Sequence, residues 1–210
     1  MVRIAKSALL VCAIYALGGC AAFTFPEKEI TSYAEVPEGY VLLVGKIELD
    51  PPLRPTEIKL DIPNDVLNTE EMMANRAIIG LSDRENVTVE KSRFLINPEL
   101  GQTYFFAVPR ERAHMLGGYI TVSFDMRTNG PRDVIVNQGK VLVPGGMHYD
   151  LRSGDNVVYV GTLRLERGPF NDVTKAEVID EFDAANLDLK ARLGAGRRMR
   201  NSLPKQVSAN

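Results

Sequence analysis

Apolar and polar residues alternate most regularly over residues 120–126, where Ile, Val, Phe and Met take every second position. This period of two predicts a β-strand that buries one face. An Asn-Gly-Pro turn sequence follows at residues 129–131, and short apolar runs at 134–136 and 141–143 flank a further break at 137–139. The pattern predicts a meander of short hairpins in this part of the chain.

Two further strands are predicted upstream of this meander. Residues 104–108 form a continuous apolar run between Gly101 and Pro109, which is typical of a strand buried on both faces. Residues 87–91 alternate more weakly and predict a half-buried strand. Both segments add to a body that is rich in strands.

Residues 41–50 and 157–166 have matching patterns, each with a glycine at the same internal position. Apolar residues fill both faces before Gly45 and Gly161 and only one face after them. A strand that leaves the buried middle of a sheet has this pattern, and the glycine permits a bulge or a close backbone approach. We interpret the two segments as equivalent first and last strands. The alternative is a chance likeness between two β-rich sequences.

A helix is predicted near the C-terminus, beginning at Thr174 and ending before Gly194. Thr174 and Glu177 have the spacing of a capping box, which satisfies free backbone amides at a helix start. The helix carries an apolar stripe of five residues: Val178, Phe182, Ala185, Leu189 and Leu193. We expect this stripe to cover the sheet rather than to bind another protein. A second, weaker helix is predicted over residues 68–79.

The number and spacing of the strands indicate the fold class. About seven or eight short strands separated by glycine and proline turns favour a sandwich or barrel over alternating β-α-β units. We predict a mainly β protein: a small antiparallel β-sandwich with a C-terminal α-helix, formed by residues 39–193. Residues 143–151, followed by the strand at 157–165, resemble the Pro-Gly-x-Tyr hairpins of transthyretin-like and prealbumin-like domains found in many envelope lipoproteins. The resemblance implies a transthyretin-like sandwich.

Residues 1–19 have the pattern of a bacterial export signal. Arg3 and Lys6 precede an apolar stretch at residues 8–17, and small residues follow it. The stretch is too short to span a bilayer. We therefore expect residues 1–19 to be a signal peptide that is removed during export.

The end of this signal, with Leu17, Gly18 and Gly19 before Cys20, resembles the lipobox of bacterial lipoproteins. The resemblance implies that Cys20 is acylated and becomes the mature N-terminus, which anchors the protein in a membrane. Ala21 stands where Asp often marks retention in the inner membrane, so the resemblance favours the outer membrane. The alternative is an ordinary secretory cleavage site beside an incidental cysteine.

Residues 20–38 are predicted to form a lipidated tether, because they contain scattered apolar residues and two prolines without a regular pattern. Fully extended, such a tether reaches about 50 to 60 Å. In the alternative interpretation, Phe23, Phe25 and Tyr33 pack on the domain.

Cysteine content and charge narrow the picture further. Cys20 would be the only cysteine left after cleavage, so the domain would depend on core packing without a disulfide. The formal net charge of −2 does not indicate a nucleic-acid partner, and we predict none. Residues 194–210 contain basic and no acidic side chains, and we expect a basic, disordered tail. In the alternative, Arg197, Arg198 and Arg200 contact anionic lipids.

No catalytic residue, metal site or cofactor is predicted. The chain has two histidines, His114 and His148, and no serine lies in a Gly-x-Ser-x-Gly sequence. His148 and Asp150 place two kinds of metal ligand on one side of a strand, and His114 would add a third only if the fold brought it close. A phosphate-binding glycine loop and tryptophan are both missing.

Together these patterns favour a non-catalytic envelope lipoprotein that acts as an interaction or structural component at the periplasmic face of the outer membrane. Its expected partners are the membrane, through the N-terminal lipid, and another envelope protein. The alternative is a module that binds a small ligand or glycan through tyrosines and carboxylates at strand ends. A third hypothesis is a metal-dependent or hydrolytic enzyme centred on His148 and Asp150.

Overall fold

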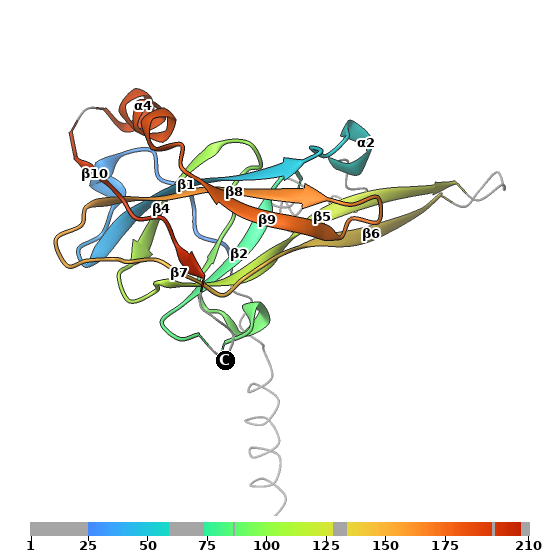
Figure 1. Ribbon diagram of the computed structural model, residues 1–210, viewed down its shortest axis with the longest axis horizontal. Coiled ribbons are helices and arrows are strands. Elements are labelled where there is room, and N and C mark those ends of the chain that lie inside the picture. Colours follow the sequence, from blue (N-terminus) through green and yellow to red (C-terminus); the bar gives the residue numbers. More distant parts are fainter. Residues whose placement is uncertain (1–24, 59–73, 86, 128–133, 195, 207–210) are drawn as a thin grey trace, which may run out of the picture.

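The computed structural model describes residues 25–58, 74–85, 87–127, 134–194 and 196–206 (Figure 1). Its strands are β1 (Tyr40–Asp50), β2 (Ala77–Ser82), β3 (Leu95–Ile96), β4 (Thr103–Pro109), β5 (His114–Arg127), β6 (Val134–Val143), β7 (Met147–His148), β8 (Val157–Arg167), β9 (Val173–Ile179), β10 (Met199–Asn201) and β11 (Lys205–Gln206). Its helices are the 3-10 helices η1 (Tyr33–Glu35) and η2 (Val89–Lys91) and the α-helices α2 (Pro55–Ile58) and α4 (Phe182–Leu193). The protein is mainly β with a C-terminal helix, as predicted.

The strands of the described residues form two sheets that pack face to face. The first sheet has the order β10-β8-β1-β4, with β9 also paired to β8, and the second has the order β11-β7-β5-β2-β3, with β6 also paired to β5. Most neighbours are antiparallel, as predicted, but β8 runs parallel to both β1 and β10. The sheets enclose one large apolar cluster, so the architecture is a β-sandwich.

The outer face of the first sheet carries a second apolar cluster beneath helix α4. Strand β4 contributes to both clusters, because Tyr104 and Phe106 point between the sheets while Phe105 points outward. Ile30 and Leu189 cover Phe105 from the N-terminal segment and from α4. The prediction that residues 104–108 form a strand buried on both faces is therefore confirmed.

The two matching segments are neighbours in the first sheet, where β1 and β8 run side by side in parallel. Their register shifts by one residue between Val44 and Lys46, and after this shift each residue pairs with its counterpart in the other segment, as Lys46 does with Thr162. The predicted bulge at the glycines is thus confirmed. β1 is the first strand, but β8 is not the last, since β9, β10 and β11 follow it.

The C-terminal helix begins eight residues later than predicted. Residues 173–179 form strand β9 instead, and the Thr174 hydroxyl donates a hydrogen bond to the Glu166 carbonyl oxygen rather than capping a helix. The β-branched residues of this segment favour a strand, and the turn before it returns the chain to β8. From Phe182 onward the predicted stripe packs on the sheet as expected, and the helix ends at Gly194, whose φ is +84°.

Three other sequence predictions differ from the structure. The break at 137–139 lies inside the continuous strand β6, because β5 is long enough to pair with all of it. Residues 87–91 contain the 3-10 helix η2 rather than a strand. The helix predicted over residues 68–79 is wrong throughout its described part, because residues 74–75 form a turn, Arg76 forms a bridge with Glu99 and β2 begins at Ala77. Its first six residues lie outside the described part of the chain. The turn at 129–131 also lies outside it.

Candidate functional site

The lipobox residues Leu17, Gly18, Gly19 and Cys20 precede the described residues, which begin at Phe25. The first backbone hydrogen bond between the described chain and the sandwich is made two residues later, at Glu27. The Glu27 amide donates a hydrogen bond to the Leu95 carbonyl oxygen at 2.7 Å, and Glu27 forms a parallel bridge with Ile96. The predicted tether over residues 20–38 is therefore wrong from Glu27 onward, because this part of the chain is docked on the sandwich.

The docked segment is held by charged and apolar contacts. The Glu29 carboxylate accepts hydrogen bonds from the Phe105 backbone amide at 3.0 Å and from the Arg192 guanidinium at 3.1 Å. Ile30 is buried, and its amide donates to the Phe105 carbonyl oxygen at 2.9 Å. Tyr33 also packs on this cluster. We call the segment Glu27–Val36 the N-terminal strap, because it connects strand β4 to helix α4.

The alternative interpretation of the tether is thus right for one aromatic residue and wrong for another. Tyr33 packs on the domain, whereas Phe25 is 55% exposed. Phe23 lies outside the described residues.

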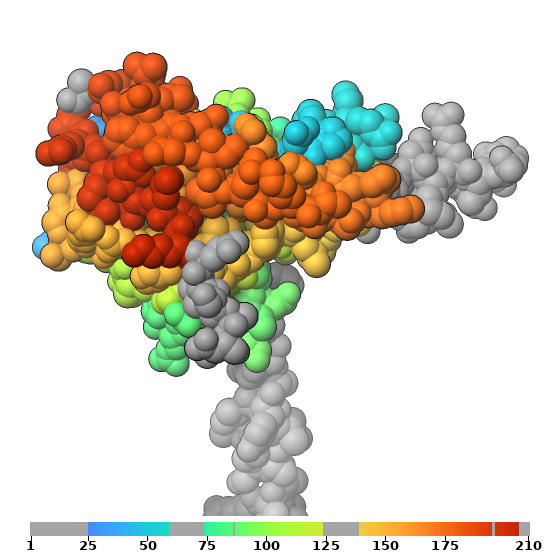
Figure 2. Space-filling model, in the orientation of Figure 1, coloured from blue at the N-terminus to red at the C-terminus, as the bar shows by residue number. Residues whose placement is uncertain are grey.

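The C-terminal tail is ordered over most of its length, contrary to prediction. Met199 is buried in the cluster beneath α4, and strand β10 pairs in parallel with the start of β8. Strand β11 then pairs with β7 in the other sheet. Figure 2 shows this C-terminal segment, in red, lying flat on one face of the domain. The prediction of a disordered tail relied on its basic composition and overlooked Met199, the apolar residue that packs the tail on the domain.

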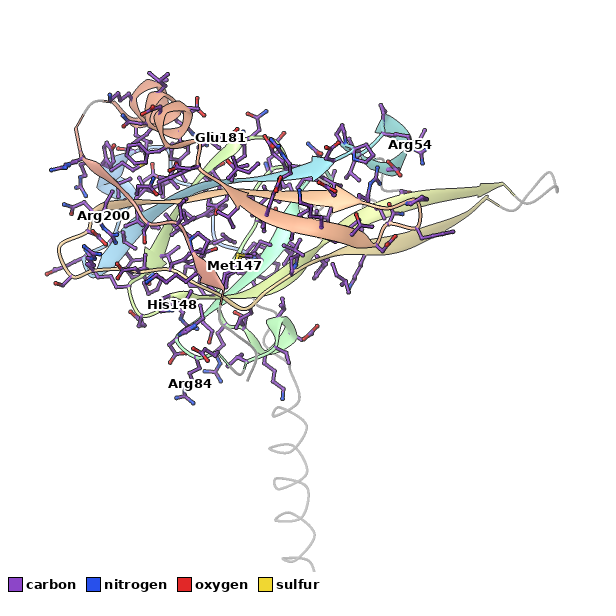
Figure 3. All side chains as sticks on the ribbon, in the orientation of Figure 1. Arg54, Arg84, Met147, His148, Glu181 and Arg200 are labelled. Carbon is purple, nitrogen blue, oxygen red and sulfur yellow. The ribbon has the colours of Figure 1, made fainter. Side chains whose placement is uncertain are left out.

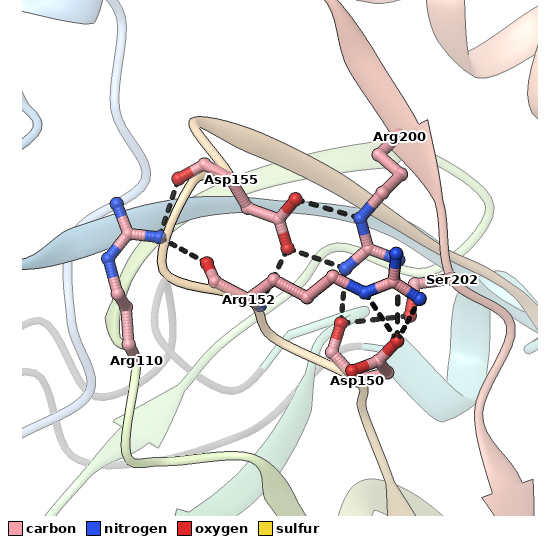
Figure 4. Close-up of polar contacts among 6 residues, drawn as sticks. All are labelled: Arg110, Asp150, Arg152, Asp155, Arg200 and Ser202. Atoms are coloured by element: carbon pink, nitrogen blue, oxygen red, sulfur yellow. Dashed lines mark hydrogen bonds and ion pairs between the residues drawn. The ribbon is translucent and has the colours of Figure 1, made fainter.

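Arg200 fastens this tail to the loop between β7 and β8 (Figure 4). Its guanidinium donates to the Asp155 carboxylate, with 2.8 Å between Nε and Oδ1, and to the Asp150 carbonyl oxygen. The Asp155 side chain is only 8% exposed, and the hydrogen bond from Arg200 lowers the pKa of its carboxyl group. Arg110 closes the loop from the other side by donating to the carbonyl oxygens of Arg152 and Asp155.

The three arginines proposed to contact lipid have different surroundings. The Arg200 guanidinium is hydrogen-bonded to Asp155 and forms an ion pair with Asp150, so it does not contact lipid headgroups in this conformation. Arg197 is exposed and lies over the Tyr33 ring, with 5.1 Å between its guanidinium carbon and the ring centroid. Arg198 is exposed.

Both histidines of the chain meet in the second sheet, where β7 lies between β11 and β5 and Lys205 of β11 pairs with His148. His114 on β5 and His148 on β7 are directly paired residues, and their ring centroids lie 4.6 Å apart. His148 Nδ1 is buried and has no hydrogen-bond partner among the described residues. The Glu85 carboxylate lies 4.0 Å from His114 Nδ1.

The hypothetical site of His148 and Asp150 is not assembled as the sequence suggested. The Asp150 carboxylate accepts hydrogen bonds from Arg152, at 2.9 Å from Nε, and forms an ion pair with Arg200. It is His114, rather than Asp150, that lies against the His148 ring. In the described part of the chain, no group of three or more His, Cys, Asp and Glu side chains is arranged to hold a metal ion.

A charged cluster at the β1–β8 bulge positions the start of helix α4. Lys46 Nζ lies 2.7 Å from carboxylate oxygens of both Glu48 and Glu181, and Thr162 donates a further hydrogen bond to Glu181. The hydrogen bond from Lys46 lowers the pKa of the Glu181 carboxyl group. Glu181 and His148 lie at opposite edges of the domain, so this cluster is separate from the histidine pair (Figure 3).

The core between the sheets has little free space. A cavity lined by Tyr104, Met115 and Tyr149 measures about 10 Å³, which is room for about one water molecule. The Tyr149 hydroxyl donates to the Met115 sulfur at 3.1 Å, and burial raises the pKa of this tyrosine above its ordinary value. This cavity gives no support to a small-ligand site inside the sandwich.

The β8–β9 hairpin presents an aromatic residue to solvent at its tip. Phe170 is 91% exposed. The turn is closed by a hydrogen bond from the Gly168 amide to the Asp172 carbonyl oxygen, at 2.8 Å, and Asn171 has a φ of +63°. The sequence Gly168-Pro169 is turn chemistry that would have located this hairpin from sequence.

A buried ion pair supports the base of this turn. Arg167 Nη1 lies 3.0 Å from Glu57 Oε1, both side chains are 6% exposed, and Arg167 also donates to the Asn171 side chain at 2.8 Å. Burial alone would raise the pKa of Glu57, but hydrogen bonds from Arg54 and Arg167 outweigh it and lower the pKa to about 2. The turn is therefore held in one conformation by the domain beneath it.

Comparisons with known proteins do not assign the fold or the site. The chain matches no protein-family model, and comparisons with curated proteins and with solved structures also give no match. Among the helices of the described residues, none has both the length and the apolar character needed to cross a bilayer.

Proposed function

We propose that the protein is a lipoprotein anchored through Cys20 at the periplasmic face of the outer membrane, where it acts by contact and without catalysis. The observation that carries this proposal is the sequence Leu17-Gly18-Gly19-Cys20 directly after a charged and apolar export signal. Several acyl chains on one cysteine give stable attachment, since each buried methylene contributes about 0.8 kcal/mol.

The docked strap supports a close attachment to the membrane. Glu27 is hydrogen-bonded to the domain, so the chain between Cys20 and Glu27, fully extended, spans at most about 25 Å. A lipid on Cys20 would therefore keep the β3 edge of the sandwich near the bilayer surface. Such a short link restricts the surfaces that remain open to a partner.

The rigid tip of the β8–β9 hairpin supports an interaction role. Aromatic residues dominate the energetics of protein interfaces, and a residue that is already fixed in its bound position loses little conformational entropy on binding. Phe170 combines almost complete exposure with a turn fixed by hydrogen bonds and by the Glu57–Arg167 ion pair. We propose that Phe170 inserts into an apolar pocket of an envelope protein.

The finer fold assignment, a transthyretin-like sandwich, belongs to the same proposal. It is supported by the resemblance of residues 143–151 to the hairpins of such domains and by the face-to-face packing of the two sheets. The parallel pairing of β8 with β1 is an additional feature of this chain.

Metabolic labelling tests the anchor. In bacteria supplied with a palmitate analogue, the wild-type chain is expected to become labelled and to fractionate with the outer membrane, and Cys20→Ala is expected to lose both properties. Cys12→Ala is the matched control, because it removes the other cysteine without touching the lipobox. Equal labelling of wild type and Cys20→Ala, or recovery of the wild type with inner membranes, contradicts the proposal.

Site-specific photocrosslinking tests the contact. A benzoylphenylalanine at position 170 is expected to give a discrete crosslinked product in cells. The same group at position 187 is the control, because Leu187 is also exposed but lies on helix α4. Absence of a product at position 170, or equal products at both positions, rejects Phe170 as the contact residue.

A further inference from the structure

An exposed aromatic residue lies beside the point where the N-terminal strap joins the sandwich. Phe25 is 55% exposed, and two residues later the Glu27 amide donates a hydrogen bond of 2.7 Å to the Leu95 carbonyl oxygen. Glu27 also forms a parallel bridge with Ile96 of β3. The backbone next to Phe25 is therefore fixed, and its ring faces solvent from a defined place on the domain.

The length of chain between Phe25 and Cys20 limits how far this ring can lie from a membrane. The two residues are five positions apart in the sequence. Fully extended, such a segment spans at most about 18 Å. An acylated Cys20 lies at the level of the lipid headgroups, so Phe25 stays within this distance of the bilayer interface. The inference that follows rests on the proposed anchor at Cys20.

The chain before and within β3 alternates between the core and the outer surface. Phe94 and Ile96 are buried in the core between the sheets, whereas Arg93 is exposed and Leu95 is half-buried. Arg93 and Leu95 therefore point away from the core. Leu95 adds apolar surface at the place where Glu27 is attached.

Three basic side chains lie on the same segments. Lys28 follows the bridge to β3, and Lys91 and Arg93 precede β3. All three are exposed, and within the described residues none is at ion-pair distance from an acidic group. Exposed Glu27 and Glu90 offset most of this positive charge. Charge alone therefore gives little attraction to a lipid surface, and an apolar side chain has to supply the contact.

Helix α4 lies on the side of the domain opposite to this surface. It covers the outer face of the first sheet, whereas β3 belongs to the second sheet. Figure 3 shows Arg84, from the segment between β2 and β3, at the bottom of the domain and Glu181, at the start of α4, at the top. Leu187 on α4 is 67% exposed, so it offers an apolar reference position far from the anchor.

We propose that Phe25 inserts its ring into the interface of the phospholipid leaflet that holds the lipid on Cys20, with Leu95 against the surface and Lys28 and Arg93 beside lipid phosphates. Aromatic rings are enriched at the membrane–water interface. Docking of the adjacent backbone on β3 lowers the entropy that the ring loses on insertion. The inserted ring orients the sandwich, with β3 toward the bilayer and α4 away from it.

Tryptophan fluorescence tests this insertion, because the chain contains no tryptophan. The lipidated Phe25→Trp protein, reconstituted into phosphatidylcholine vesicles, is expected to show blue-shifted emission compared with the same protein in detergent-free buffer as its unlipidated Cys20→Ala form. Its fluorescence is expected to fall when the acyl chains of the lipids carry bromine, and high salt is expected to leave this quenching unchanged. Leu187→Trp is the matched control, because it is also exposed and is expected to show neither change.

Flotation of the same vesicles separates the insertion from the anchor. If the lipidated Phe25→Trp protein floats with the vesicles but brominated lipids do not quench it, the anchor stands and the insertion of Phe25 is overturned. Equal quenching of the tryptophans at positions 25 and 187, or loss of quenching at high salt, also overturns it. If the wild-type protein from labelled cells does not float, the anchor itself is contradicted, and the inference falls with it.

Discussion

Gly45 and Gly161 lie beside each other where the parallel strands β1 and β8 change register, and a Cβ atom on Gly45 would lie 3.0 Å from the Gly161 carbonyl oxygen. The Tyr104 hydroxyl fills the space above Gly45, at 2.5 Å from the same Cβ position. Gly161 has a φ of +92°, which side-chain-bearing residues rarely adopt. The bulge thus requires glycine in both strands, and this explains the shared position of the glycine in the two sequence segments.

Gly161→Ala is expected to destabilise the domain strongly. Its Cβ would lie 2.5 Å from Val178 Cγ1 on β9, in a backbone conformation that is already unfavourable for alanine. The strain and the overlap together are expected to lower the free energy of unfolding by about 2 to 4 kcal/mol, and urea denaturation of the variant and the wild type checks this. Gly154→Ala is the control, because its Cβ meets no atom within 4 Å, and a change below about 0.5 kcal/mol is expected. Equal effects of the two substitutions would show that the bulge tolerates a side chain.

Arg200→Met is expected to release the C-terminal strand. It leaves the buried Asp155 carboxylate without its ion-pair partner, which costs about 2 to 4 kcal/mol of stability. Hydrogen exchange of the Ser202 amide, which donates to the Tyr159 carbonyl oxygen, reports local opening. Arg198→Met changes an exposed neighbour and is expected to leave this exchange rate unaltered. Similar exchange in both variants would argue against Arg200 as the residue that fastens the tail.

The strands that were predicted correctly are those in which the local order of apolar and polar residues matches the burial of each position. The run at 104–108 is apolar at every position because each face of β4 meets a different cluster. The alternation at 120–126 lies within β5, although Thr121 and Ser123 on the polar side are also buried. Patterns of this kind are local, so the spacing of residue types is enough to predict them.

The elements that the sequence missed depend on contacts between distant segments. The sequence of strand β9 is compatible with the start of a helix, and only the turn that pairs it with β8 makes it a strand. Strand β10 lies in a basic segment and has one buried residue, Met199. The Glu57–Arg167 ion pair joins residues 110 positions apart, and the contact of His114 with His148 depends on the register of β5 and β7. Single-sequence periodicity carries no information on such pairings.

Glu29→Gln is expected to loosen the N-terminal strap. The substitution removes the ion pair with Arg192 and weakens the acceptor of the Phe105 amide, so the strap loses one of the contacts that dock it on β4 and α4. Faster hydrogen exchange of the Ile30 amide and faster proteolysis within residues 27–36 are the expected results. Glu27→Gln serves as the control, since its exposed side chain can change while the backbone bond to Leu95 remains. No difference between the two variants would mean that the Glu29 side chain does not hold the strap.

Glu57→Gln is expected to remove part of the acid sensitivity of the domain. The pKa of Glu57 is lowered in the folded protein from 4.5 to about 2, because the hydrogen bonds from Arg54 and Arg167 outweigh the effect of burial. A depressed folded-state pKa gives stability that is fully present above pH 4.5 and is lost as the pH falls toward 2. This contribution is about 3 kcal/mol, and the amide variant lacks it at every pH.

Urea unfolding at several pH values between 7 and 2.5 measures this difference. The wild type is expected to exceed Glu57→Gln by the largest margin near pH 7, and the margin is expected to shrink steadily below pH 4.5 as the wild-type carboxylate is protonated. Glu111→Gln, at an exposed position in the β4–β5 turn, controls for the loss of one negative charge. A margin that stays constant down to pH 2.5 would contradict the expected linkage, because it would mean that Glu57 stabilises the hairpin base equally well when protonated.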